Sequence, residues 1–247
     1  MSLRGKPLKV NYAYRQLADE IEDQIMQGTL LPGERLPGEV ELAELFGVTR
    51  STVREGLRQL ECEGLVNRPS PRRLEVALPQ SEKLASRAGR AMILMNVTFS
   101  ELWQVALETE SLAAALAAEQ ANPETIRKLE DIHARFIAVE DDIVEATRLD
   151  TLFHAQIAEM SENRVLKLAR EPIALLLYQG FLQIAPKIPQ AIERQKEAHT
   201  HILSAIRDRD PVRARDWTRR HIKDFWLGVQ MAGLENEPSI PKDITKE

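Results

Sequence analysis

The chain has 247 residues, of which 43% are hydrophobic and 29% charged, and its formal net charge is −5. This composition excludes a disordered chain, and no apolar run approaches the roughly 18 residues that a membrane span needs. A single cysteine, Cys62, excludes an internal disulfide, and no apolar signal segment follows the first residues. We therefore expect a cytoplasmic, two-domain globular protein in which Cys62 serves packing.

The N-terminal part begins with a predicted helix over about 14–26, whose apolar stripe is formed by Leu17, Ile21 and Ile25. A turn-rich segment with two Pro-Gly dipeptides follows over 30–38. A short helix over about 39–46 then ends at Gly47, because glycine tolerates the positive φ of a helix C-terminus.

A third helix is expected immediately afterwards, capped by Thr49 or Ser51 and buried along Val53, Leu57 and Leu60. Two short helices around a tight turn are typical of a helix-turn-helix. Residues 1–80 are nearly neutral, so any case for DNA depends on where the charges lie. The outer face of the third helix carries hydroxyls and cations suited to phosphates and base edges, namely Arg50, Ser51, Thr52, Arg54 and Arg58.

Two short strands are predicted over 65–68 and 73–76, forming a hairpin wing around Pro69, Ser70, Pro71 and Arg72. Arginines at the tip of such a wing, Arg72 and Arg73, are candidates for DNA contact.

Beyond residue 79 a linker turns into helix, and the period then stays helical to about residue 231. The expected helices are 99–120, 123–139, 141–160, 163–183, 189–207 and 211–231. We therefore predict a mainly α fold: a winged helix-turn-helix over 1–78, a linker and connecting helix over 79–98, a helical bundle over 99–234 and a loose tail over 235–247.

Four residues of the helical region form a candidate metal site. Asp150 and His154 are four residues apart and share one helix face. His199 and His221 each fall on the apolar stripe of their own helix. One carboxylate and three imidazoles suit a divalent ion, zinc in the first place, with nickel or another ion as alternatives. The two other histidines, His133 and His201, are expected at the surface.

The N-terminal part resembles the GntR superfamily of transcription regulators. The matching residues are Gly28, Leu30, Pro32, Gly33, Arg35, Leu36, Pro37, Leu42, Ala43, Phe46, Gly47, Val48, Thr49, Arg50, Val53, Arg54, Leu57, Leu60, Gly64 and Leu65. The resemblance implies that the third helix contacts DNA through Arg50, Ser51, Thr52 and Arg54, with the wing in a minor groove. Arg35 is also expected to bind DNA. The chain departs from the family at Val40, where an arginine is common, and in a wing tip without glycine.

The C-terminal region resembles the FCD domain of the FadR-like branch, through Asp150, His154, Asn163, His199 and His221. The resemblance implies an antiparallel helical bundle that binds a metal and a small acid. An arginine that usually faces the acid is replaced by Ala106. Arg148, Arg164 and Arg194 are possible substitutes, and we expect Arg148 and Asn163 to contact the effector.

These features predict a homodimeric, DNA-binding regulator, a repressor by expectation, whose affinity for an operator with inverted half-sites is controlled by an organic acid at the metal. One alternative is a metal-dependent hydrolase, since such ligands can activate water. Another is a regulator whose metal is purely structural.

Overall fold

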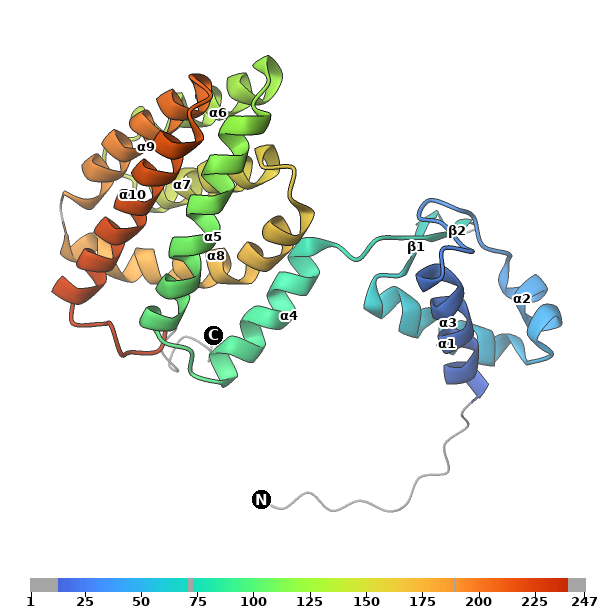
Figure 1. Cartoon of the computed structure of the whole chain (residues 1–247). Coiled ribbons are helices and arrows are strands. Elements are labelled where there is room, and N and C mark those ends of the chain that lie inside the picture. Colours follow the sequence, from blue (N-terminus) through green and yellow to red (C-terminus); the bar gives the residue numbers. More distant parts are fainter. Residues whose placement is uncertain (1–12, 71–72, 189, 240–247) are drawn as a thin grey trace, which may run out of the picture. The chain divides into compact units, whose positions relative to one another are not determined.

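The computed structural model describes residues 13–70, 73–188 and 190–239, and the chain divides after Gln80 into two compact units (Figure 1). The mainly α fold is confirmed, with ten α-helices and one two-stranded sheet among the described residues. None of the described helices combines the length and apolar character needed to cross a membrane.

The first unit is the predicted winged helix-turn-helix. Its elements are α1 (Ala13–Met26), α2 (Glu39–Phe46), α3 (Arg50–Glu63), β1 (Val66–Ser70) and β2 (Arg73–Val76). The expected stripes of α1 and α3 meet in one apolar core that also includes residues of both strands. The turn between α2 and α3 depends on Gly47, which has φ 63° and whose N–H satisfies the end of α2.

The wing has a third extended segment, in a region predicted to contain only turns. Leu36 donates its N–H to the carbonyl of Leu74, and Val76 donates to the carbonyl of Glu34. Arg35 and Glu75 form an antiparallel bridge in the same place. Residues 33–36 therefore pair with β2 and join the turn region to the wing.

The second unit is an all-helical bundle. Its elements are α4 (Ser81–Leu94), α5 (Phe99–Gln120), α6 (Pro123–Ile137), α7 (Ile143–Met160), α8 (Arg164–Ile184), the 3-10 turn η1 (Ala185–Lys187), α9 (Ala191–Arg207) and α10 (Pro211–Met231). Four fully buried alanines of α5, Ala113, Ala114, Ala117 and Ala118, lie in its main core. Because these side chains are small, neighbouring helices can approach α5 closely.

Two helices begin two residues later than expected. The helix predicted from about 141 begins at Ile143, because the Asp142 side chain caps it by accepting the N–H of Glu145. The helix predicted from about 189 begins at Ala191, after η1. The connecting helix expected within 79–98 is α4, which starts at Ser81 and belongs to the second unit.

The tail expected to be loose over 235–247 is ordered in its first part. Ser100 and Phe99 donate their N–H groups to the carbonyls of Glu235 and Glu237, and Ser239 donates to Val97. The bonds from Phe99 and Ser100 satisfy donors at the start of α5 that have no partner within the helix. The rest of the expected tail, 240–247, lies outside the described residues.

Candidate metal centre and DNA-binding surface

The start of α3 presents the predicted DNA-contacting side chains to solvent. Arg50, Ser51 and Arg54 are exposed and Thr52 is half-buried. Thr49 is the N-cap, and its hydroxyl accepts the N–H of Thr52 and lies 2.8 Å from that of Ser51. The hydroxyls are thus tied to the helix start, where the backbone N–H groups also favour an anion such as phosphate.

Glu39 of α2 gathers two arginines beside this surface. Its carboxylate lies 3.3 Å from Nε of Arg54 and 3.1 Å from Nη2 of Arg68. Arg68 of the wing also pairs with Glu61 of α3 at 2.6 Å. Sequence reasoning missed Arg68 and Glu39, because only the fold brings α2, α3 and the wing together.

The remaining predicted DNA contacts are in the wing region. Arg35 and Arg73 are exposed, and Arg73 is ion-paired with Glu75. Arg72 lies outside the described residues. Cys62, expected to serve packing, is exposed near the end of α3, because its position falls off the buried stripe.

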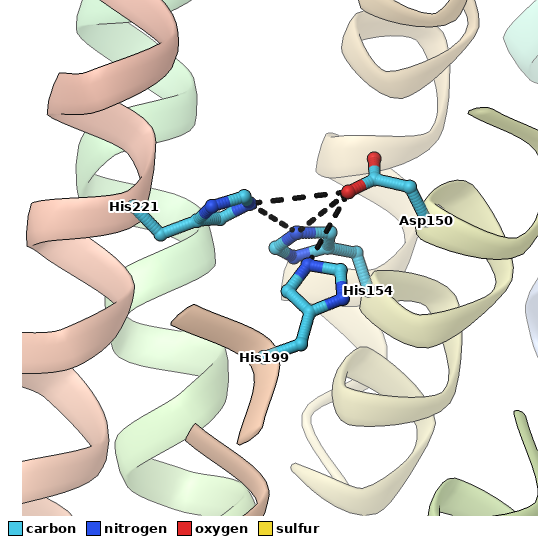
Figure 2. Close-up of side chains that lie close together, drawn as sticks. All are labelled: Asp150, His154, His199 and His221. Atoms are coloured by element: carbon cyan, nitrogen blue, oxygen red, sulfur yellow. Dashed lines mark hydrogen bonds and ion pairs between the residues drawn. The ribbon is translucent and has the colours of Figure 1, made fainter. Parts of the chain in front are cut away.

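The four predicted metal ligands converge inside the bundle. Figure 2 shows Asp150 and His154 of α7 meeting His199 of α9 and His221 of α10 around one point. One ligand atom from each residue lies within 4.8 Å of all the others. Nε2 of His199 is 3.2 Å from Oδ1 of Asp150, and Nε2 of His154 is 3.0 Å from Nε2 of His221.

The arrangement of these donor atoms suits coordination of a cation better than hydrogen bonding among the four residues. Oδ1 of Asp150 and Nε2 of His199 are buried, and although they lie 3.2 Å apart, neither forms a hydrogen bond with the other or with another described residue. Unsatisfied buried polar atoms are costly and rare in folded proteins. An ion shared by the four residues would satisfy all of them, and three imidazoles with one carboxylate are a donor set for zinc or a similar divalent metal.

Aromatic packing fixes His199 in place. Its ring stacks on Phe153 with centroids 4.0 Å apart and an interplanar angle of 10°. Burial first, and then the charges of nearby histidines, hold the pKa values of His199 and His221 well below the ordinary value. Both imidazoles therefore stay neutral, as metal ligation requires.

His154 is held differently, by Glu110 of α5. Burial lowers the pKa of His154, but the hydrogen bond and charge of Glu110 outweigh burial and raise it above the ordinary value. Nδ1 of His154 lies 3.2 Å from Oε2 of Glu110, while Oε1 of Glu110 accepts a 2.9 Å hydrogen bond from Nε of Arg170. Burial raises the pKa of Glu110, but Arg170 and His154 prevail and lower it to about 2.

Glu110 and Arg170 were not among the predicted site residues. The sequence held a signal, since Glu110 precedes the buried Ala113 and Ala117 and Arg170 stands between the buried Leu166 and Ile173. A charged residue on an apolar stripe is rarely buried without a partner. Sequence alone, however, did not reveal that these two stripes face each other.

A cavity of about 610 Å3, counting its open mouth, is lined in part by three of the four candidate metal ligands, Asp150, His154 and His221, and we call it the central cavity. Its polar half is lined by Glu110, Thr147, Asp150, Thr151, His154, Arg170, Gln195 and His221. Its apolar wall is formed by Trp103, Ala106, Ala174, Leu177, Tyr178, Phe181, Ile222 and Phe225.

The residues expected to contact an effector are absent from this lining. Arg148 forms a bidentate pair with Glu145 at 2.6 Å, and Asn163 caps α8 by accepting the N–H of Leu166. Arg164 is exposed, and Arg194 pairs with Asp224. The arginine that does line the cavity together with Ala106 is Arg170.

The two histidines expected at the surface behave differently from each other. His133 is buried, and its Nε2 lies 3.0 Å from the hydroxyl of Thr200, so that expectation was wrong. The tight pairing of α6 with α9 covers it. His201 is half-buried and stacks on Trp217 at 3.8 Å, away from the metal cluster.

A winged helix-turn-helix joined to a helical unit with a central cavity is the architecture of a two-domain, DNA-binding transcription regulator. Comparison with known proteins agrees. The FCD domain model matches residues 101–224, and the model of bacterial regulatory proteins of the gntR family matches residues 13–76. The chain belongs to the GntR family of bacterial regulatory proteins and carries an FCD domain, which confirms the resemblance drawn from the sequence.

Relatives cover nearly the whole chain. The HTH-type transcriptional repressor NanR of Klebsiella aerogenes is 30% identical over 90% of this chain and 87% of its own length. The repressor of the same name from Cronobacter sakazakii is 30% identical over 93% of this chain and 90% of its own. The solved structure of Streptococcus agalactiae GntR is similar with a TM-score of 0.60 at 25% identity, covering 86% of this chain and 98% of that one.

Proposed function

We propose that this regulator is a homodimeric repressor whose second unit holds a divalent metal ion through Asp150, His154, His199 and His221. A small organic acid binding beside that ion changes its affinity for operator DNA. The observation that carries the proposal is the convergence of four buried or half-buried donor atoms at the edge of the central cavity. When bound, an ion with four protein ligands can offer a further position to an anionic oxygen.

The first unit supplies the DNA contacts. We assign contacts with bases and phosphates to Arg50, Ser51, Thr52 and Arg54. We assign contacts with the DNA backbone to Arg35, Arg72 and Arg73 of the wing region. A symmetric dimer would then read two inverted half-sites. Its affinity would fall steeply with salt, because binding releases counterions from the DNA phosphates and this release is less favourable at high salt.

Helix α8 offers a route from the cavity to the DNA-binding unit. Its residues Arg170, Ala174 and Leu177 line the cavity. Ile173 and Leu176 of the same helix share a core with residues of α4, the helix that directly follows the first unit. A ligand that shifts α8 therefore acts on α4, and a coupling of roughly 1 to 3 kcal/mol is enough for regulation.

A hydrolase is the less favoured function. The carboxylate nearest the cluster that is not itself a ligand in our assignment is Glu110, which is paired with Arg170 and has a pKa of about 2. A general base works best with a pKa near the operating pH, so Glu110 is poorly suited to that role. Turnover by the metal-loaded protein would contradict this part of the proposal.

The test combines DNA selection with metal analysis. Duplexes selected from a random pool by the purified full-length protein give an operator for affinity measurement. We expect that affinity to change at least fivefold on adding a ligand to the metal-loaded protein, and not in the double variant His199→Ala/His221→Ala. If the ligand changed the operator affinity of the double variant equally, sensing would not depend on the metal, and the ion would be purely structural.

A further inference from the structure

The central cavity joins two unlike surfaces, and this contrast restricts what it binds. This inference rests on the proposed function, because it names the class of ligand for the same site. Its lining combines the apolar wall with Arg170, Gln195 and three candidate metal ligands, Asp150, His154 and His221. Ligand sites of this kind fix orientation with a few polar groups and gain affinity from the apolar surface.

The lining offers one arginine to an acid group. Arg170 is the one arginine or lysine among the described residues that line the cavity. Its Nε is bonded to Glu110, and its Nη1 lies 3.7 Å from Oε1 of Glu171. A second carboxylate on the ligand would lie against the apolar wall without a cationic partner, which is unfavourable.

Arg170 has donors to spare for such a carboxylate. Its side chain is only 3% exposed, and its one hydrogen bond to a described residue is the bond from Nε to Glu110. A guanidinium has five N–H donors, and it matches a carboxylate in geometry. Arg170 is thus placed to bind the carboxylate of a ligand in the central cavity.

The apolar wall gives the ligand's body few hydrogen-bonding partners. Trp103 stacks on Trp226 with ring centroids 4.7 Å apart, and Phe181 and Phe225 lie 6.2 Å apart. The nearby hydroxyls of Thr147 and Thr151 already donate to backbone carbonyls at 2.6 and 2.9 Å. A polyhydroxylated body would therefore lose its water here without replacement.

Apart from atoms of Glu110, Asp150 and His154, two buried polar atoms of the lining residues lack hydrogen-bond partners among the described residues, Nε1 of Trp103 and Oε1 of Gln195. Gln195 is itself buried. One is a donor and the other an acceptor, so the site accommodates one or two polar substituents on an otherwise apolar body.

We propose that the ligand is an amphipathic monocarboxylate, with its acid group at Arg170 and the metal-binding residues and an aromatic or branched aliphatic body against the apolar wall. Sugar acids and dicarboxylates are excluded as preferred ligands.

Calorimetric titration of the zinc-loaded, full-length protein with four probes tests this. Phenylacetate and 4-methylpentanoate carry the predicted class of body, gluconate is a polyhydroxylated monocarboxylate, and succinate is a dicarboxylate. We expect at least one of the first two to bind with a dissociation constant tenfold or more below those of gluconate and succinate. Preference for gluconate or succinate, or binding by none of the probes, overturns the proposal.

A matched pair of variants on α8 locates the body of the ligand. Leu177→Gln places a polar group in the apolar wall, whereas Leu168→Gln changes an exposed leucine of the same helix. We expect the first to weaken binding of the preferred probe about tenfold or more and the second to leave it unchanged. Equal effects overturn the proposal. Metal content and DNA binding, measured on the same preparations, report separately on the proposed function.

Discussion

Oε2 of Glu110 lies 3.2 Å from Nδ1 of His154, so a carboxylate on α5 holds the outer nitrogen of an imidazole on α7. This contact favours the tautomer with its proton on Nδ1 and leaves Nε2 free to ligate a metal ion. Arg170 completes the chain of contacts by holding the other oxygen of Glu110. The candidate metal ligands, the buried ion pair and the central cavity are therefore one connected structure.

Glu110→Gln should weaken metal binding by about 10- to 100-fold, the usual effect of losing a partner that orients a ligating histidine. Competition with a chromophoric chelator measures this affinity. The control is Glu108→Gln, on the same helix, which removes an exposed pair with Arg219 and should leave metal affinity unchanged. Because Glu110→Gln also leaves Arg170 buried without its partner, the variant's circular dichroism must show that it is folded.

Metal binding near neutral pH should release at most about one proton, and that proton comes from His154. Its pKa is raised, so part of the metal-free protein carries a proton there, whereas His199 and His221, with lowered pKa values, are already neutral. The release should grow as the pH falls from 8 toward 6.5, because more His154 is then protonated. Calorimetry in buffers of different ionisation enthalpy measures it. Release of two or more protons would contradict this assignment.

Arg54→Ala should abolish specific binding to the selected operator, because it removes a cation from the outer face of α3. A shift of at least tenfold in the dissociation constant is expected in fluorescence anisotropy. Lys128→Ala, which alters an exposed lysine of the second unit, is the control. Unchanged footprinting of the operator by the Arg54 variant would show that α3 docks differently.

Glu39→Gln should strengthen DNA binding, in contrast to Arg54→Ala. The carboxylate of Glu39 competes with phosphate for Arg54 and Arg68, which lie 3.3 and 3.1 Å away. Its neutralisation should strengthen binding to duplexes of any sequence several-fold at low salt, with a smaller gain at high salt. Weaker binding would mean that Glu39 instead orients the two arginines for DNA.

Much of this architecture could be predicted from the sequence, because local patterns determine it. Several features depend only on residues that are neighbours in the sequence. They are the apolar stripes of α1 and α3, the turn at Gly47, and the capping of α3 by Thr49 and of α10 by Asp210. The metal cluster was also predictable, since Asp150 and His154 share a face and His199 and His221 stand on buried stripes.

Other features depend on how helices distant in sequence pack together. Glu110 and Arg170 meet only because α5 and α8 are neighbours, and His133 is buried only because α6 packs on α9. No spacing within a single helix predicts such a meeting. For the same reason the sequence pointed to Arg148 and not to Arg170 as the effector arginine, although Arg148 is paired with Glu145 on its own helix.

The metal content of the purified protein tests the central claim most directly. His199→Ala/His221→Ala removes two ligands, while His201→Ala changes a half-buried histidine that stacks on Trp217 outside the cluster. After zinc loading and desalting, elemental analysis should give about one ion per chain for the unaltered protein and for His201→Ala, and close to none for the double variant. Equal metal content in the double variant and the unaltered protein would contradict the assignment of Asp150, His154, His199 and His221 as the metal centre.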